Sequence, residues 1–351
     1  MTRRSSLTGA AFLLTALAGR SQAATCPFNV PVVTLPPQQV GGFKWGAVIR
    51  PMGDPCVTAI AVDPASDLEW YVGGANGLYM TKDGGQTWAQ PLQGAVGPLI
   101  LVPGNPVLVY VGVAAKLYLS RDKGATWHVV GTYPYPVRSV LAVGGTLYVG
   151  LGWSTHAVLS GVYVSNLGGA PPQFQPFGPG QTGLIVWTLA HDPLTGILYA
   201  GAEIFDHPKP YHPPFFRSTN GGVSWTNVAG ARPWHVISAA VRPADGFVYA
   251  LTEGAGLFGS ANQGAAWQVR AKAPAPSGSL LMDPKTPARL FGGRQKLGNV
   301  TGGVFVSLNA GQAFQLAGLQ DATVAGVALN GASTRLFAAC YASGVYVSPV
   351  P

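Results

Sequence analysis

One short run of residues recurs along this chain, and it limits the possible folds more than any other feature. Residues 77–88 comprise a mostly apolar stretch ending in Thr, a turn rich in Asp and Gly, and a tryptophan. Comparable runs occupy 116–127, 214–225, 256–267 and 303–314, a looser copy spans 161–174, and a last copy, 344–348, stops where its turn would begin. Seven copies in register indicate a repeat architecture.

The turn in these runs has the pattern Ser/Thr-x-Asp/Asn-x-Gly-x-x-aromatic. Its Asp or Asn can accept backbone N–H groups, its Gly can take a positive φ, and its aromatic ring can pack on the hairpin. The positions are Asp83 and Trp88, Asp122 and Trp127, Asn220 and Trp225, Asn262 and Trp267, and Asn309 and Phe314. The pattern resembles the Asp-box, or BNR, repeat. That resemblance implies that these residues staple hairpins and carry no chemistry.

Two further strand patterns precede each turn run. The expected innermost strands are 57–62, 99–102, 137–142, 186–190, 236–241, 279–282 and 324–329. The expected second strands are 69–73, 108–112, 146–150, 197–201, 247–251, 289–293 and 335–339. With the strand before each turn and the strand after it, every unit has four antiparallel strands, a to d. Such sheets bury their faces by packing radially, so we predict an all-β, seven-bladed β-propeller.

The two ends of the chain suggest how the ring closes. The seventh unit ends at Ser348 after its third strand, whereas 44–49 matches the fourth strand that follows each turn elsewhere. Trp45 then stands where Trp88 stands in the first unit. We therefore expect the N-terminal strand to complete the last blade, with one propeller over 43–351 and an N-terminal arm over 24–42.

Residues 1–23 have the features of an export signal. Arg3 and Arg4 precede an apolar run over 7–18, and small residues near Ala23 suit cleavage. Arg3-Arg4-Ser5-Ser6-Leu7 fits either a twin-arginine signal or an ordinary secretory one. No later stretch is long enough to cross a bilayer. We expect an exported protein, periplasmic or secreted.

Composition narrows the possible partners. The chain has 48 glycines, 30 prolines and 10% charged residues, which fits many short strands and turns. The formal net charge is +8, and loss of the three arginines in 1–23 leaves +5. This mild excess favours anionic partners, but the chain has no basic block or nucleic-acid motif. We expect a monomer without a cofactor or nucleic-acid partner.

The three cysteines are Cys26, Cys56 and Cys340, and their spacing matches no metal motif. In an exported protein two of them can pair. A Cys26–Cys56 bridge would join the arm to the first blade, and Cys26–Cys340 would join it to the last. We favour Cys26–Cys56, which leaves Cys340 free.

A ligand site is expected on one end of the ring. The a–b and c–d turns share one end, the box face, whereas the b–c loops and d–a connections share the other, the loop face. The long insertions are the b–c loops 151–160, 202–213 and 294–302. Variable loops on a rigid scaffold carry binding. The candidate ligand residues there are Arg50, Arg138, Trp153, Tyr211, Arg232, Trp234 and His235, which suit sugars, carboxylated glycans or a peptide terminus.

The loop of the fourth blade contains three weak metal-ligand candidates, Asp206, His207 and His212. The alternative is a Pro-stiffened surface loop whose polar residues face solvent, since the spacing is not that of a tight ligand set.

Glu203 and Glu253 occupy equivalent places in neighbouring blades, four residues after the Tyr of each second strand. Glycosidases use two carboxylates that flank the scissile bond. Tyr249-Ala250-Leu251-Thr252-Glu253 resembles the Tyr-Ala-Arg-Thr-Asp segment with the catalytic Asp of xyloglucanase-type Asp-box hydrolases. Here Glu replaces that Asp, Leu251 replaces the Arg, and those enzymes place the partner carboxylate in a second propeller. The alternative is two solvated or loop-bonded glutamates.

Two other resemblances bear on function. Sialidases carry Asp boxes, but on six blades with an arginine triad that we cannot assign here. Photosystem assembly factors of the Ycf48 type are seven-bladed Asp-box propellers that bind through an arginine-lined face. We therefore predict a binding or assembly propeller for a polypeptide or glycan. The alternative is a glycan-active hydrolase or lyase using Glu203 and Glu253.

Overall fold

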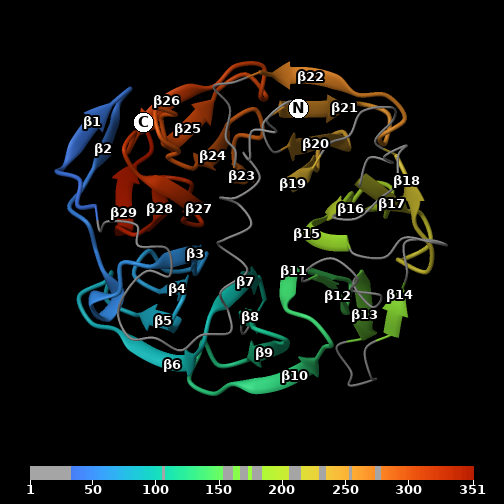
Figure 1. Ribbon diagram of the computed structural model, residues 1–351, viewed down its shortest axis with the longest axis horizontal. Coiled ribbons are helices and arrows are strands. Elements are labelled where there is room, and N and C mark those ends of the chain that lie inside the picture. The colour runs from blue at the N-terminus through green and yellow to red at the C-terminus, as the bar shows by residue number, and fades with distance from the viewer. Residues whose placement is uncertain are drawn as a thin grey trace, which may run out of the picture.

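The chain forms a ring of seven β-sheets around a central axis (Figure 1). The computed structural model describes residues 33–104, 107–152, 161–166, 173–175, 184–204, 215–228, 235–252, 255–272 and 278–351. Its only helical element in this part of the chain is one 3-10 turn, η1, at Pro51–Gly53. The architecture is the predicted seven-bladed β-propeller of mainly four-stranded antiparallel blades.

Each blade follows the chain outward from the axis. Blades 1 to 3 comprise β3 Val57–Val62, β4 Trp70–Gly74, β5 Gly77–Thr81 and β6 Ala89–Gln93; β7 Val96–Val102, β8 Leu108–Val113, β9 Lys116–Ser120 and β10 His128–Thr132; and β11 Val137–Val143, β12 Thr146–Leu151, β13 Val162–Asn166 and β14 Gln173–Gln175. The predicted first, second and third strands are all present, with ends that move by a few residues.

The other four blades repeat this order. They comprise β15 Leu184–His191, β16 Leu198–Ile204, β17 Phe215–Ser218 and β18 Thr226–Asn227; β19 Val236–Arg242, β20 Phe247–Thr252, β21 Gly256–Ser260 and β22 Gln268–Ala271; β23 Ser279–Met282, β24 Leu290–Arg294, β25 Gly303–Ser307 and β26 Gln315–Gly318; and β27 Thr323–Leu329, β28 Arg335–Tyr341 and β29 Gly344–Pro349. The last sheet has three strands.

The first strands of neighbouring blades contact one another all around the axis. Hydroxyl groups link several of them. Ser139 donates to the Val186 carbonyl at 2.9 Å, and Thr188 accepts from the Ala239 N–H at 3.1 Å. These bonds tie the inner strands of blades 3, 4 and 5 together.

Aromatic rings from the second strands fill the space between blades. Tyr110, Tyr199, Tyr249, Phe291 and Phe337 occupy the same position in their blades and are buried. Full burial of such a ring contributes about 1.5–3 kcal/mol. Because each hydrophobic cluster takes residues from adjacent blades, the blades stabilise one another rather than folding alone.

The turn of blade 1 shows how the repeated polar residues work. Asp83 Oδ1 accepts the Thr81 hydroxyl at 2.7 Å and the backbone N–H groups of Gln86 and Thr87 at 3.0 and 2.9 Å. The Thr87 hydroxyl also donates to Asp83 Oδ2 at 2.5 Å. This bond contributes most, and together with the others it lowers the pKa of Asp83 to about 2. In four other turns a Ser hydroxyl takes the place of Thr81 and donates in the same way to Asp122, Asn220, Asn262 or Asn309.

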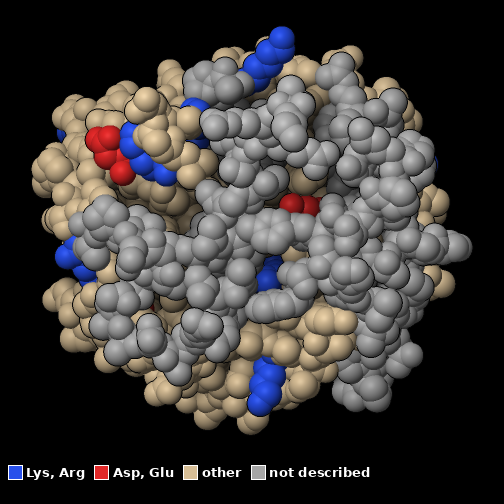
Figure 2. All heavy atoms as spheres, in the orientation of Figure 1, with Lys and Arg blue, Asp and Glu red and all other residues tan. Residues whose placement is uncertain are grey.

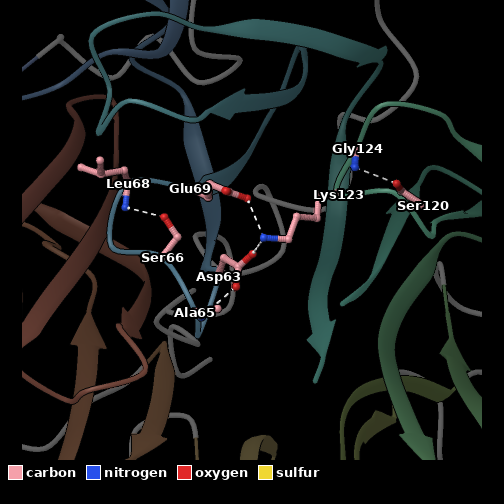
Figure 3. A network of polar contacts seen from close by, with 8 residues as sticks. All are labelled: Asp63, Ala65, Ser66, Leu68, Glu69, Ser120, Lys123 and Gly124. Atoms are coloured by element: carbon pink, nitrogen blue, oxygen red, sulfur yellow. Dashed lines mark hydrogen bonds and ion pairs between the residues drawn. The ribbon is translucent and has the colours of Figure 1, made fainter. Parts of the chain in front are cut away.

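The box face also joins blades directly. Lys123, from the turn of blade 2, reaches back to the a–b turn of blade 1 (Figure 3). Its Nζ lies 2.8 Å from Asp63 Oδ2 and 3.3 Å from Glu69 Oε2. Burial alone would raise the pKa of Asp63, but the contacts with Lys123 and the Ala65 N–H hold it below its usual value. This ion pair fastens two blades.

The N-terminal segment differs from the regular strand expected over 44–49. Trp45 belongs to β2, Phe43–Trp45, which pairs with β1, Gln38–Val40. After β2 the chain follows β29 with one bridge, Ile49 to Val345, and a further hydrogen bond from the Gly46 N–H to the Val347 carbonyl at 3.0 Å. Trp45 is buried and donates its indole N–H to the Ala317 carbonyl at 2.7 Å, which draws it toward blade 6. Ring closure by this segment stays a prediction.

The described part of the chain contains two of the three cysteines and none of the predicted export signal. Cys56 is disulfide-bonded, and Cys340 is free and buried in β28. Cys26 and the signal at 1–23 lie outside the described residues, so the Cys26–Cys56 pairing and the export signal stay predictions. No helix within the described ranges is long and apolar enough to cross a membrane.

Candidate binding site at the loop face

Six of the seven innermost strands carry an irregularity near their N-terminal end. These residues follow the d–a connections, so they lie at the loop face, close to the axis. In five blades the register skips one residue: Thr58, Arg138, Trp187, Ile237 and Ala325. A β-bulge changes the direction of a side chain. The ring thus presents a different side chain at the same place in each of these blades.

Arg138 and Trp187 occupy two neighbouring bulges, in blades 3 and 4. The Arg138 guanidinium carbon lies 5.7 Å from the centroid of the Trp187 ring, and its Nε donates to the Gly152 carbonyl at 3.0 Å. Burial lowers the pKa of Arg138 to about 10, so it remains a cation at neutral pH. A desolvated cation stacked on an indole is held in one orientation.

Glu203 lies in β16, next to Trp187, and is buried. Its Oε2 accepts the Trp187 indole N–H at 3.0 Å, and its Oε1 lies 3.4 Å from His235 Nδ1. The Glu203 side chain is 10% exposed and that of His235 is 40% exposed. We call Arg138, Trp187, Glu203 and His235 the mouth cluster. It draws on blades 3, 4 and 5. The face drawn in Figure 2 has acidic and basic atoms near its centre.

The structure brings together three of the predicted site residues, Arg138, Glu203 and His235. Arg50 serves a different purpose: it donates to the Ser343 carbonyl at 2.9 Å and to the Thr34 hydroxyl, and so holds the N-terminal segment against blade 7. The other candidates, Trp153, Tyr211, Arg232, Trp234, Glu253, Asp206, His207 and His212, lie outside the described residues. The predicted glutamate pair and metal site are therefore untested.

Trp187 is the member of the mouth cluster that the sequence analysis missed. A usable signal existed, because three inner strands begin with Val, a variable residue, and Ser or Thr: 137–139, 186–188 and 236–238. The middle residue of each triplet is the bulged one. Among the described residues, no group of three or more His, Cys, Asp or Glu is arranged to hold a metal.

Comparisons with known proteins show the fold. No family model matches the chain, and no curated protein matches it. Among solved structures, a GH74 xyloglucanase from Xanthomonas campestris aligns with a TM-score of 0.66 at 17% identity, over 87% of this chain and 53% of that one. YCF48 bound to D1 peptide aligns with a TM-score of 0.60 at 15% identity, over 92% and 98%. The extracellular domain of BT4673 from B. thetaiotaomicron aligns with a TM-score of 0.63 at 15% identity, over 88% and 40%.

These neighbours match the resemblance inferred from the repeats. They include a glycoside hydrolase and a propeller solved with a bound peptide, so the fold is compatible with both functions. The chain spans about half the length of the xyloglucanase. At these identities the likeness is one of fold, and function has to be argued from the site.

Proposed function

We propose that this chain is an exported binding propeller that takes a polypeptide or glycan at the loop face, around the mouth cluster. The observation that carries the proposal is the state of Glu203. Each of its carboxylate oxygens already faces a group of the protein, Trp187 Nε1 or His235 Nδ1, and little of the side chain is exposed. The carboxylate orients Trp187 and His235, and this arrangement suits recognition.

A glycoside hydrolase needs a different arrangement. Its acid must reach the glycosidic oxygen, and a second carboxylate must lie across the scissile bond. Glu203 is instead engaged with its own blade and the next one. The likeness to YCF48 with its peptide, which covers nearly all of both chains, also supports a binding role. The likeness to the xyloglucanase supports the second candidate, a hydrolase using Glu203 and Glu253.

The two candidates predict opposite results from the same variants. The mature protein would be screened against a glycan array, a peptide array and a set of polysaccharides for cleavage. For a binding propeller, Trp187→Ala and Arg138→Gln weaken the ligand by about 1–3 kcal/mol each. Polysaccharide cleavage that disappears in both Glu203→Gln and Glu253→Gln would instead establish the hydrolase.

Trp88→Ala is the matched control, since it removes an indole from the box face. Trp88 is only half-buried, packs edge-on against Trp70 at 6.2 Å and donates to the Gly85 carbonyl at 3.0 Å. We expect it to cost about 2–3 kcal/mol of stability, below the range for a fully buried tryptophan. The affinity of the folded fraction should not change. Lost binding in a folded Trp88→Ala protein would move the site to the box face.

A further inference from the structure

The b–c loop of blade 6 is a long insertion that the structure describes completely. It joins β24 to β25 and makes a small hairpin at its far end. Leu297 and Val300 form an antiparallel bridge, with the Val300 N–H donating to the Leu297 carbonyl at 2.8 Å. Gly298, at a φ of +52°, and Asn299 make the turn between them. We call residues 296–301 the blade-6 tip.

The base of this loop is fixed by hydrogen bonds to the connection between blades 6 and 7. The Lys296 N–H donates to the Thr323 hydroxyl at 3.0 Å, and the Gly302 N–H donates to the Gln320 carbonyl at 2.9 Å. The Gly303 N–H adds a bond to the Ala322 carbonyl at 3.0 Å. The tip is therefore presented on a supported hairpin, which reduces the entropy lost when a partner binds.

The tip exposes two aliphatic side chains next to each other. Leu297 is 41% exposed and Val300 is 42% exposed. Residues directly opposite in an antiparallel pair have side chains on the same side, so the two form one apolar spot. Single exposed apolar residues are ordinary, but this pair lies together on a hydrogen-bonded hairpin at the same face as the mouth cluster, where a partner can reach both side chains.

The charges around the tip indicate what it contacts. Residues 294–302 contain Arg294 and Lys296 and no acidic residue. Lys296 Nζ lies 3.9 Å from Asp321 Oδ1, a loose pair in which both side chains are partly exposed, and the Arg294 guanidinium lies over the Phe305 ring at 5.5 Å. Such an exposed pair is worth little, so Lys296 can turn to a better partner at small cost. With two cations, Arg294 and Lys296, against the one carboxylate of Asp321, the surroundings carry a net positive charge, which favours a partner with carboxylates.

We infer that the blade-6 tip docks an acidic polypeptide, with an apolar side chain of that partner seated on Leu297 and Val300 and its carboxylates beside Lys296. A polypeptide fits better than a glycan because aliphatic side chains offer a sugar neither an aromatic face nor a hydrogen bond. The inference rests on the proposed function and selects a polypeptide from its two ligand classes.

The test uses an array of synthetic peptides in which acidic, basic and apolar residues vary independently, followed by titration of the best binder with the mature protein. We expect the preferred peptides to combine carboxylates with an apolar residue. Leu297→Ser combined with Val300→Ser should weaken them about tenfold. The matched control is Val223→Ser combined with Leu308→Ser, which removes aliphatics that are 66% and 64% exposed on the box face.

Several outcomes would overturn the inference. They are equal affinity in the tip variant and wild type, a preference for basic peptides, no peptide binding at all, or tip-dependent binding to anionic lipid vesicles. A ligand that is lost in Trp187→Ala and Arg138→Gln but kept in the tip variant would leave the proposed function standing and reject this inference. A ligand that is kept in all of these variants would reject both.

Discussion

The two ends of this ring use repetition in opposite ways. On the box face, the same side-chain chemistry recurs in blade after blade: a hydroxyl, an Asp or Asn and backbone N–H groups satisfy one another within each turn. On the loop face, the bulge at the start of the inner strand recurs, but it holds Thr58, Arg138, Trp187, Ile237 or Ala325. The backbone repeats there and the side chain does not.

This difference separates stability from recognition. A residue type that returns at every copy of a structural position meets a need of the fold, such as closing a hairpin. A position that keeps its backbone geometry while its side chain varies is free to bind something else. Box residues that prove necessary for binding, or mouth-cluster variants that unfold the ring, would contradict this assignment of stability to one face and recognition to the other.

The largest expected effect comes from removing the N-terminal segment. Deleting residues 24–50 removes Trp45 and Phe43 from the core and exposes the edge of β29, which now accepts from Gly46 and Ile49. An exposed strand edge promotes aggregation. We expect loss of the cooperative melting transition and formation of oligomers by size-exclusion chromatography. A monomeric truncated protein with an unchanged melting temperature would show that the segment does not close the ring.

The strands were predictable from sequence because their signal is repeated and local. Each inner and second strand alternates with turn residues at a regular spacing. Because the pattern returns in every blade, an atypical residue in one copy does not obscure the strand assignment. The segment at 44–49 was harder, because its match to a fourth strand rested on one short run with Trp45 in the place of Trp88 and on the missing fourth strand of the seventh unit. In the structure Trp45 instead pairs within β1–β2 and donates its indole N–H to the Ala317 carbonyl of blade 6, a long-range contact that the local sequence does not reveal.

The site was less predictable because it depends on which residues already have partners. From the sequence, Arg50 and Arg138 have the same expected role, because each lies where a d–a connection leads into an inner strand. Arg50 precedes β3, and Arg138 is the second residue of β11. Only the structure shows Arg50 committed to Ser343 and Thr34, and Arg138 stacked on Trp187. Trp187 itself was overlooked because a bulge is a feature of pairing between strands, and its sequence signal emerges only when 137–139, 186–188 and 236–238 are compared with one another.

A smaller effect on the box-face side of the comparison is expected from Lys123→Met. The change leaves Asp63, which is buried, without the ammonium that lies 2.8 Å away, while the blade 1 turn keeps its own hydrogen bonds. We expect a loss of about 1–3 kcal/mol in urea unfolding, below the cost of breaking a fully buried pair because Lys123 is partly exposed. Gln263→Met is the control, since Gln263 has the same left-handed backbone in its turn, with a φ of 58°. Equal losses of unfolding free energy in the two variants would mean that the ion pair between Lys123 and Asp63 does not stabilise the fold.

The smallest effect should be present at neutral pH and disappear in acid. The pKa of Asp83 and that of Asp122 are lowered to about 2, chiefly by hydrogen bonds from Thr87 and Thr126. A carboxylate whose pKa is lower in the folded state stabilises that state above its unfolded pKa, about 3.9, and the stabilisation is lost as the pH falls through about 2. Asn already occupies this position in three turns, and the Asn220 amide donates to Ser224 at 2.9 Å, as an Asn could to Thr87 or Thr126.

The double variant Asp83→Asn, Asp122→Asn should therefore fold with the same architecture. Its melting temperature should lie slightly below that of the wild type at pH 7, and the gap should close between pH 4 and pH 2, because the wild type alone loses these two carboxylates. Comparing melting curves across this range isolates the two turns, since every other acid titrates in both proteins. A gap that stays constant with pH would show that the charge of these residues contributes nothing, and that hydrogen-bond geometry alone explains why the turn accepts either side chain.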